Sequence, residues 1–493
     1  MRFGLDDSVI EKLTEVFEAH PKVDKAYIFG SRAKGNFRAD SDIDIAIKGY
    51  GLTLDDILKM SVAFEDKGIT HKIDLLDYNE IKEPALIEHI DRVGVEFYSR
   101  WKEYKFSELL LDESISYGIV QPGTHTEINS VPIIRGNNLK NGKIITDEIM
   151  KVSATIEEKF LRTRLIGGEL LITVVGSVGE CAIVPAALKG WNVARAISVA
   201  RIKQGFDTEY IKYAFKTDDL AFQMYGNTND TVQPTLNLSS LKGLILTLPS
   251  FKEQNKITSI LLSLDNKIDL LHRQNKTLEQ LAETLFRQWF VEEAEEDWEE
   301  KRLIDVIKLI GGGTPKTENP EYWDGNIKWI SARDITPNHK GFISNTEKSI
   351  TESGLKNSSA KIIEKYSTII SARGTVGKYC LLSEPMAFSQ SNYGIQPKLG
   401  GLFFFTYLLI AHSVEELQAA AYGSVFDTIT TNTFTEHKIK IPPETDLFQF
   451  EKKIESYFKK IESNQTQIQS LTKMRDTLLP KLMSGEVRVK MPG

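Results

Sequence analysis

Three aspartates near the start of the chain have a spacing suited to metal-dependent phosphoryl chemistry. Asp42 and Asp44 alternate with isoleucines, so a strand here would place both carboxylates on one face. Two carboxylates at that spacing repel each other unless a hard cation lies between them. Asp74 follows in a second apolar stretch, His-Lys-Ile-Asp-Leu-Leu. Three such carboxylates can hold two Mg²⁺ ions and align a triphosphate with an attacking oxygen.

A phosphate-binding segment is expected beside these carboxylates. Residues 26–29 are apolar and predict a buried strand, after which Gly30 and Ser31 should turn the chain and offer backbone amides to phosphates. The whole stretch AYIFGSRAKGNFRADSDIDIAI, residues 26–47, together with Asp74, resembles the signature of the minimal nucleotidyltransferases of the polymerase-beta superfamily. The resemblance covers about residues 1–98, and every motif residue is present.

That resemblance implies an enzymatic domain. Asp42, Asp44 and Asp74 would be the catalytic metal ligands, and Gly30 and Ser31 would bind the nucleotide. The domain would use Mg²⁺ and an NTP and transfer a nucleoside monophosphate to an acceptor. Small domains of this family often pair with a helical, toxin-like partner protein. The alternative is a degenerate domain that is retained for packing or protein contact.

The rest of the chain contains a long internal repeat. WKEYKFSELL from Trp101 resembles WEEKRLIDVI from Trp298, and LLITVVGSVGECAIV resembles TIISARGTVGKYCLL, with Gly179 matching Gly377. The unit is too long for a solenoid and indicates a duplicated domain. Each copy is strand-like and punctuated by glycine at first, then strongly helical.

Both helical tails carry a heptad seam. Apolar residues recur at alternating steps of four and three after Pro249 and again after Pro443. An antiparallel register that pairs Ile257 with Leu482 also pairs Asn275 with Asn464. Because a buried Asn costs stability unless it meets another, this match favours the register. Two helices packing separately on their own domains is the alternative.

Residues 101–493 resemble the specificity (S) subunit of type I restriction–modification systems. The resemblance rests on ordered phrases in both repeats, including GGGTPKTENPEYWDGNIKWISARDI (311–335), SARGTVGK (371–378), EQNKITSILLSLDNKIDLLHRQNKTLEQLAETLFRQWFV (253–291) and LTKMRDTLLPKLMSGEV (471–487). It implies two target recognition domains, each reading half of a bipartite site in double-stranded DNA. It also implies two modification (methyltransferase) subunits docked on the coiled coil, joined by restriction subunits.

The expected fold class is α+β and multidomain: an N-terminal nucleotidyltransferase α/β domain, then two α+β target recognition domains separated by two long helices that form an antiparallel coiled coil. The predicted segments are a nucleotidyltransferase-like domain (1–98), recognition domain 1 (101–250), long helix 1 (251–291), an acidic linker (292–300), recognition domain 2 (301–445) and long helix 2 (446–485).

Base-reading residues are harder to assign. Phosphate contacts need Lys or Arg, and base edges favour Arg, Lys, Asn and Gln. The candidates are Arg135, Asn137, Asn138, Lys140, Arg195 and Arg201 in the first repeat and Lys316, Arg333, Lys340 and Arg373 in the second. A solvated surface cation is the alternative reading for each of them, and Arg333 and Arg373 also lie in phrases typical of the family's framework.

Composition limits the remaining possibilities. The net charge is −7 and the chain has only 2 Cys with no C-x-x-C, which excludes a disulfide scaffold and a thiolate zinc site. The acidic start lacks a signal-peptide core, and the longest apolar run, near 401–411, is too short for a bilayer, so we expect a cytoplasmic protein without membrane contact. No G-x-x-x-x-G-K-[ST] loop is present, and Asn319-Pro320-Glu321-Tyr322 departs from N-P-P-Y. The specificity region should therefore need no cofactor of its own, with AdoMet and ATP bound by partner subunits.

Three functions are compatible with this sequence. The leading hypothesis is a DNA specificity subunit carrying an N-terminal nucleotidyltransferase domain. The second is a nucleotidyltransferase that modifies a protein or nucleic acid and uses the repeats for targeting. The third is an assembly protein in which neither part is active.

Overall fold

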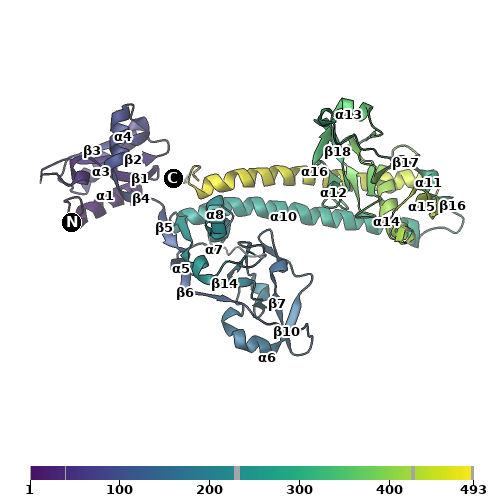
Figure 1. Cartoon of the computed structure of the whole chain (residues 1–493), viewed down its shortest axis with the longest axis horizontal. Coiled ribbons are helices and arrows are strands. Elements are labelled where there is room, and N and C mark those ends of the chain that lie inside the picture. The colour runs from purple at the N-terminus through teal and green to yellow at the C-terminus, as the bar shows by residue number, and fades with distance from the viewer. Residues whose placement is uncertain (1, 39, 227–233, 423–427, 490–493) are drawn as a thin grey trace. The chain divides into compact units, whose positions relative to one another are not determined.

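The computed structural model describes residues 2–38, 40–226, 234–422 and 428–489. It divides into two compact units, Met1–Leu262 with Thr477–Gly493, and Ser263–Asp476. The first unit holds the N-terminal domain and the first repeat, and the second unit holds the second repeat (Figure 1). None of the helices in this described part of the chain combines the length and the apolar character of a membrane span.

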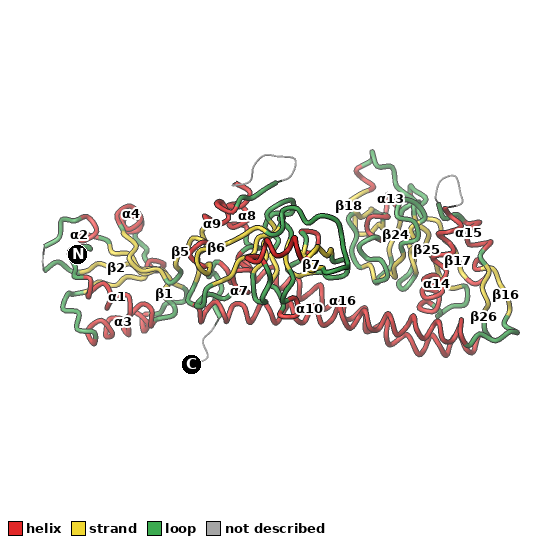
Figure 2. Tube along the Cα trace, turned by 90° about the horizontal axis from the view of Figure 1, so that it is seen from below, coloured by secondary structure: helices red, strands yellow, loops and turns green. Residues whose placement is uncertain are grey.

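The N-terminal domain is a four-stranded sheet with helices on both faces. Its strand order is β3-β2-β1-β4, and β2 runs parallel to β3 and antiparallel to β1. Helices α1 and α3 cover the face that buries Ile43, Ile45 and Ile47, and α4 covers the opposite face through Ile90 against Ala46 (Figure 2). The elements are α1 (Asp7–Ala19), β1 (Val23–Ile28), α2 (Gly30–Lys34), β2 (Ile43–Gly49), α3 (Leu54–Asp66), β3 (Ile73–Asp77), α4 (Pro84–Val93) and β4 (Val95–Ser99).

The first repeat consists of two main sheets with short helices around them. The sheets have the orders β12-β11-β14-β6 and β10-β7-β13, and β5 pairs separately with β15. Their bounds are β5 (Lys102–Lys105), β6 (Leu110–Tyr117), β7 (Ser130–Ile134), β10 (Met150–Ser153), β11 (Leu170–Thr173), β12 (Cys181–Ile183), β13 (Asn192–Val193), β14 (Ile197–Ile202) and β15 (Ile245–Leu248). The helices include α5 (Phe106–Leu109), α6 (Ala154–Glu157), α7 (Thr208–Ala214), α8 (Asp218–Gly226) and α9 (Leu238–Gly243).

The second repeat has the corresponding sheets. They have the orders β17-β25-β22-β23-β19 and β20-β18-β24-β21, and β16 pairs with β26. Their bounds are β16 (Glu299–Arg302), β17 (Ile307–Gly311), β18 (Trp323–Ile330), β19 (Phe342–Ile343), β20 (Lys348–Ile350), β21 (Ile362–Ile363), β22 (Thr368–Ser371), β23 (Tyr379–Leu382), β24 (Met386–Phe388), β25 (Asn392–Pro397) and β26 (Lys438–Ile441). The helices are α11 (Leu303–Val306), α12 (Ala332–Ile335), α13 (Glu352–Lys356), α14 (Phe403–Tyr422) and α15 (Thr431–Glu436). The apolar run near 401–411 forms the buried start of α14.

The two repeats share their strand pairings as well as their sequence phrases. In the first repeat β7 runs parallel to β13, and β11 lies antiparallel between β12 and β14. In the second repeat β18 runs parallel to β24, and β22 lies antiparallel between β23 and β25. The duplication inferred from sequence is therefore also a duplication of topology.

The long helices are α10 (Phe251–Arg287) and α16 (Glu444–Met483). Inside the second unit, Arg475 bonds Asp265, and the ring centroids of Trp289 and Phe450 are 5.6 Å apart. Inside the first unit, Ile257 and Leu482 share one core cluster. Because the α16 numbers fall as the α10 numbers rise, the helix segments within the second unit are antiparallel.

Several predicted bounds differ from the structure by a few residues. The second long helix, expected at 446–485, is α16 at Glu444–Met483. The first was expected to reach residue 291; its α-helical part ends at Arg287, and a π-helical turn, Gln288–Glu292, continues it to residue 292. Aromatic packing accompanies this turn, since Phe290 lies against both Phe405 and Phe450. The acidic segment also ends before residue 300, because Glu299–Arg302 forms β16 and pairs with β26.

Candidate functional site

The three aspartates of the N-terminal domain lie near one another at one end of its sheet. Asp44 lies on β2 directly opposite Asp74 on the parallel strand β3. Asp42 immediately precedes β2, which begins at Ile43 rather than at Asp42 as the alternation predicted. Burial raises the pKa of Asp44, and the neighbouring charges of Asp74 and Asp42 raise it further. This is the electrostatic signature of crowded carboxylates that a cation would relieve.

Lys72 lies among these carboxylates. Its Nζ is 2.9 Å from Asp42 Oδ2 and 3.1 Å from Asp74 Oδ1. Its hydrogen bonds, to Asp42 Oδ2 at 2.9 Å and to Asp74 Oδ2 at 3.3 Å, raise the pKa of Lys72. Lys72 was not among the predicted site residues, although it stands two residues before Asp74, a spacing that places two side chains on one side of an extended segment.

Gly30 packs directly against Asp44. It has φ +68°, and a Cβ added to it would lie 2.1 Å from Asp44 Oδ2, so only glycine fits this position. Gly30 and Ser31 were expected to form a turn, but they open the short helix α2. Their phosphate-binding role stays a prediction.

Arg32 holds the loop before β2 in place. It is only 2% exposed, and its guanidinium donates to the carbonyl oxygens of Ser41, Asp42 and Phe3. Arg32 was not among the predicted site residues. Its partners are backbone carbonyls, which no motif spacing identifies.

The donor set suits a hard divalent cation in its chemistry, since carboxylate oxygens are the ligands Mg²⁺ prefers. Among residues 2–38, 40–226, 234–422 and 428–489, however, no three His, Cys, Asp or Glu side chains converge on a point that could hold an ion. The ammonium of Lys72 lies between two of the three expected ligands. Metal binding here therefore requires that side chain to move.

Each repeat brings three loops together at the ends of its strands. In the first repeat, Ala194 N donates to Ile134 O at 2.8 Å and Val174 N donates to Ala196 O at 2.8 Å. These bonds join the loops after β7, β11 and β13. We call this surface the three-loop face of the first repeat, residues 135–138, 174–179 and 194–196.

The second repeat repeats the same bonds. Ser389 N donates to Ile330 O at 2.8 Å, and Ala372 N donates to Ser391 O at 2.8 Å. The three-loop face of this repeat comprises residues 331–335, 372–377 and 389–391. By these bonds Gln390 occupies the place of Arg195.

A buried capping side chain shapes the first loop in both repeats. Asn138 Oδ1 accepts from Arg135 N at 2.9 Å, and Asp334 Oδ2 accepts from Ser331 N at 2.8 Å. The residue before each cap, Asn137 in one repeat and Arg333 in the other, is exposed. Asn137 and Arg333 are therefore equivalent positions.

The predicted DNA-contacting residues divide into two groups. Those with exposed side chains are Asn137, Lys140, Arg195, Lys316, Arg333, Lys340 and Arg373. Asn138 is 4% exposed and donates to the carbonyls of Ile145 and Glu148, so its expected contact with DNA does not fit its inward orientation. Arg135 is half-buried, and its Nε is buried without a partner.

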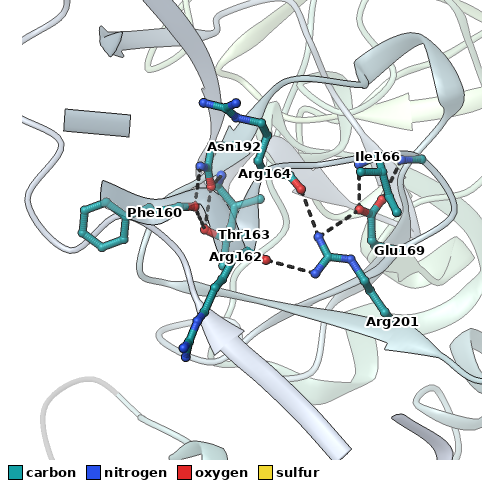
Figure 3. Close-up of polar contacts among 10 residues, drawn as sticks. Phe160, Arg162, Thr163, Arg164, Ile166, Glu169, Asn192 and Arg201 are labelled. Carbon is teal, nitrogen blue, oxygen red and sulfur yellow. Dashed lines mark hydrogen bonds and ion pairs between the residues drawn. The ribbon is translucent and has the colours of Figure 1, made fainter. Parts of the chain in front are cut away.

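Arg201 is also turned inward, contrary to expectation. Its guanidinium donates to the carbonyl oxygens of Arg162 and Arg164, both at 3.0 Å, and lies 3.6 Å from Glu169 (Figure 3). Glu169 in turn accepts from Ile166 N at 2.7 Å. Arg201 thus clamps the segment that leads into β11 rather than offering its charge to a ligand.

A second polar network fixes the other end of that segment. Glu157 is fully buried and accepts from Arg164 Nε at 2.8 Å and from Asn192 Nδ2 at 2.9 Å. Asn192 Oδ1 accepts from Thr163 Oγ1 at 2.7 Å (Figure 3). The hydrogen bond from Arg164 lowers the pKa of Glu157. Arg162, which was not among the predicted DNA contacts, is exposed on this segment.

The helix seam contains the polar pair that the register predicted. Asn464 is fully buried, and its Nδ2 donates to Asn275 Oδ1 at 2.8 Å and to Gln274 Oε1 at 3.4 Å. A buried amide needs such partners, because an unpaired one costs about 1–3 kcal/mol. The contact lies wholly inside the second unit.

Comparison with protein families finds two matches. The model described as "Type I restriction modification DNA specificity domain" matches residues 101–280 and 295–473. The model described as "Polymerase beta, Nucleotidyltransferase" matches residues 11–103.

Individual relatives agree with the first match. The MjaIX specificity subunit of Methanocaldococcus jannaschii is 28% identical over 344 residues, covering 66% of this chain and 78% of the relative. The HindI specificity subunit of Haemophilus influenzae is 26% identical over 343 residues, covering 54% of this chain and 74% of the relative. A crystal structure of an S subunit from M. genitalium superposes with a TM-score of 0.52 at 17% identity, covering 79% of this chain and 96% of that one.

Proposed function

The chain belongs to the family of type I restriction modification DNA specificity proteins, and from that premise we propose that it reads a bipartite DNA sequence, one half-site with each repeat. The observation that carries the proposal is the duplicated three-loop face. One set of backbone bonds presents exposed side chains at equivalent places in both repeats. Two readers with a common frame and different side chains are what recognition of two different half-sites requires.

The exposed residues of the two faces have suitable chemistry. Arg pairs with guanine edges and Asn or Gln with adenine edges. We assign base or phosphate contacts to Asn137 and Arg195 in the first repeat and to Arg333 and Arg373 in the second. Lys140, Lys316 and Lys340 would contact phosphates, and Gln390 joins the set as the counterpart of Arg195.

The long helices would set the distance between the half-sites and receive the partner subunits. The Asn275–Asn464 contact supports one fixed register, which such a spacer needs. Two modification subunits would dock on the helices and supply methyl transfer with AdoMet. Restriction subunits would add ATP-dependent cleavage. The assembly would act on DNA in the cytoplasm.

The N-terminal domain is of the nucleotidyltransferase type. We propose that Asp42, Asp44 and Asp74 hold Mg²⁺ there and that Gly30 and Ser31 receive the phosphates of an NTP. The ion would supply charge neutralisation for phosphoryl transfer. The close contact between Gly30 and Asp44 supports an intact site, since a relic would have no need to keep it.

DNA reading is tested by a search of the neighbouring genes for a methyltransferase-like subunit and by its co-expression with this chain. The two proteins should co-purify, and methylome sequencing of the host should show one bipartite motif that disappears with this gene. Arg333→Ala should relax or abolish one half of that motif only. Purification of the chain alone, with no methyltransferase gene nearby, would refute the assignment.

An enzyme-first function is the second candidate, favoured by the complete carboxylate motif. Here the nucleotidyltransferase would modify a protein or nucleic acid, and the repeats would target it. Incubation with radiolabelled ATP and Mg²⁺ should label an acceptor, and Asp42→Ala should abolish the label. A helical, toxin-like protein is one acceptor to include. No transfer to any partner would leave the domain an assembly element.

A further inference from the structure

Lys72 occupies the position between the carboxylates that a metal ion would need. Its ammonium is bonded to Asp42 and Asp74 at the same time, at 2.9 and 3.1 Å. Asp42 precedes β2 and Asp74 lies on β3, so the side chain links two separate segments of the site. Such a link is a different arrangement from an ordinary surface pair of neighbours on one helix, like that of Lys59 with Asp55.

The local charge explains why a cation is held here. Three carboxylates carry three negative charges, and Arg32 directs its guanidinium hydrogen bonds to backbone carbonyls. Lys72 therefore supplies the positive charge in direct contact with the carboxylates. Two of the three carboxylates that would bind a divalent ion are thus already engaged by this ammonium.

The side chain can leave without disturbing the sheet. The Lys72 side chain is 66% exposed, whereas its backbone is fixed by Ile43 N, which donates to Lys72 O at 2.8 Å. Rotation about the side-chain bonds would carry the ammonium into solvent and keep the strands in place. The displaced group would still be tethered beside the site.

We propose that Lys72 is an internal counter-ion that competes with the divalent cation for Asp42 and Asp74. The inference rests on the proposed metal site of the N-terminal domain. Without metal, Lys72 relieves the repulsion among the three carboxylates and stabilises the domain. With metal, Lys72 is displaced, so its charge raises the metal concentration at which the site fills.

The test compares Mn²⁺ binding in the full chain by electron paramagnetic resonance. Lys72→Met removes the charge and keeps the length of the side chain, and it should tighten Mn²⁺ binding about three- to tenfold, as expected for the loss of one partly exposed charged competitor. Lys72→Arg keeps the charge and should bind within about twofold of the wild type. Lys59→Met, which breaks an exposed ion pair on α3, is the matched control and should leave Mn²⁺ affinity unchanged.

Thermal unfolding gives a second readout that is independent of catalysis. In the absence of metal, Lys72→Met should lower the unfolding temperature of the N-terminal domain relative to Lys59→Met. Saturating Mn²⁺ should remove that difference. A purely structural lysine would predict the same loss with and without the ion.

The two levels of the proposal fail in different ways. Equal or weaker Mn²⁺ binding by Lys72→Met, with binding still abolished by Asp44→Asn, would overturn the role of Lys72 alone. Absence of binding in the wild type and in Lys72→Met, or full binding by Asp44→Asn, would overturn the metal site itself.

Discussion

In the first repeat, helix α6 after β10 ends in Glu157, a buried carboxylate bonded to Arg164 and Asn192. In the second repeat, helix α13 after β20 stands at the same topological place, but Leu355 packs there against a cluster that includes Trp329 and Ala387. Asn192 and Ala387 are themselves equivalent, since each pairs in parallel with the neighbouring strand. The same arrangement of strands is thus stabilised by a hydrogen-bonded buried carboxylate in the first repeat and by apolar packing around Trp329 in the second.

Comparison of the two repeats shows which structural features are common to both copies and which differ between them. Both copies keep the backbone bonds that join the three loops and the capping side chain, Asn138 or Asp334. They differ at contacts behind the loops, including the edge-to-face pair of Trp323 and Trp329 in the second repeat, whose ring centroids are 5.2 Å apart. Stability of the two copies should therefore respond differently to substitution and pH.

The largest effect should come from breaking the buried network of the first repeat. Glu157→Ala removes the carboxylate acceptor of Arg164 and one of the two acceptors of Asn192, whose amide also donates to Phe160 O at 3.1 Å. We expect a loss of about 2–4 kcal/mol in the free energy of unfolding of the first unit. Chemical denaturation with hydrogen-exchange mass spectrometry of residues 157–169 measures it. Leu355→Ala is the matched control in the second repeat, where a partly buried side chain should cost about 1–2 kcal/mol. Equal protection of 157–169 in the variant and the wild type would contradict the assignment.

The next effect concerns pH. In the second unit, Glu451 accepts from Phe404 N at 3.0 Å and Phe405 N at 2.7 Å, and burial raises its pKa to about 7 from 4.5. The folded state therefore holds an extra proton between these values, and the unit should lose stability as pH rises from about 4.5 to 7.

Gln254 plays the corresponding part in the first repeat, where it accepts from Asp207 N at 2.9 Å and cannot titrate. Glu451→Gln should accordingly reduce the pH dependence of the second unit by about 1–3 kcal/mol across that range. Glu279, whose pKa is also raised to about 7 by burial, should leave a residual slope. Thermal melts from pH 5 to 8 check this, and an unchanged slope would contradict it.

Glu157 predicts the opposite trend for the first repeat. Because Arg164 lowers the pKa of Glu157 below 4.5, its contribution is present above that pH and is lost as the pH falls through the lowered value. The protection factors of residues 157–169, corrected for the intrinsic exchange rate at each pH, should therefore fall on acidification below about pH 4.5, while those of the α14 start should not. If the stability of both repeats changed with pH in the same direction, the expected contrast between them would be refuted.

A smaller effect is expected at the helix seam of the second unit. Asn464→Leu leaves Asn275 without its partner and should cost about 1–2 kcal/mol. The double variant with Asn275→Leu should recover that loss, because apolar residues of similar size pack well at such positions. If Asn464→Leu were as stable as the double variant, the hydrogen bond between Asn464 and Asn275 would make no contribution to stability.

The smallest effect on stability is expected for exposed residues of the two three-loop faces, whose substitution should instead weaken DNA binding. Arg195→Ala and Gln390→Ala alter exposed equivalent positions, so unfolding should change by less than about 0.5 kcal/mol. In the methyltransferase complex, loss of the charged Arg195 should weaken DNA binding about fivefold or more, and loss of Gln390 by less. Fluorescence anisotropy at fixed salt measures both. Arg201→Ala is the contrasting control, since it should destabilise the first repeat.

Local pattern was sufficient for much of the N-terminal site and for the helices. The alternation around Asp44 identified the strand and its inward isoleucines, and the heptad steps identified both long helices and the Asn275–Asn464 pair. These features depend on spacing within one strand or along one helix, which sequence displays directly. The family resemblance of residues 101–493 likewise followed from ordered phrases, and the comparisons confirm it.

Other residues could be judged only from contacts between distant segments. Arg201 and Asn138 have side chains of the kind that contacts DNA, yet both donate hydrogen bonds to backbone carbonyls of this chain. Arg32 was overlooked because its partners are also backbone carbonyls. Whether a polar side chain faces a ligand or a carbonyl depends on which loop packs beside it. The topology decides which loop packs beside each side chain, and no periodic pattern in the sequence indicates it.

Amino-acid order alone thus determined the carboxylate motif, the duplication and the antiparallel helix register, because each rests on repeated short-range spacing. Tertiary structure alone decided which cations remain exposed, that Gln390 stands where Arg195 stands, and that Lys72 lies between Asp42 and Asp74. The physical reason is that hydrogen bonds and ion pairs across separate loops are made by chain packing, which fixes partners that no local pattern specifies.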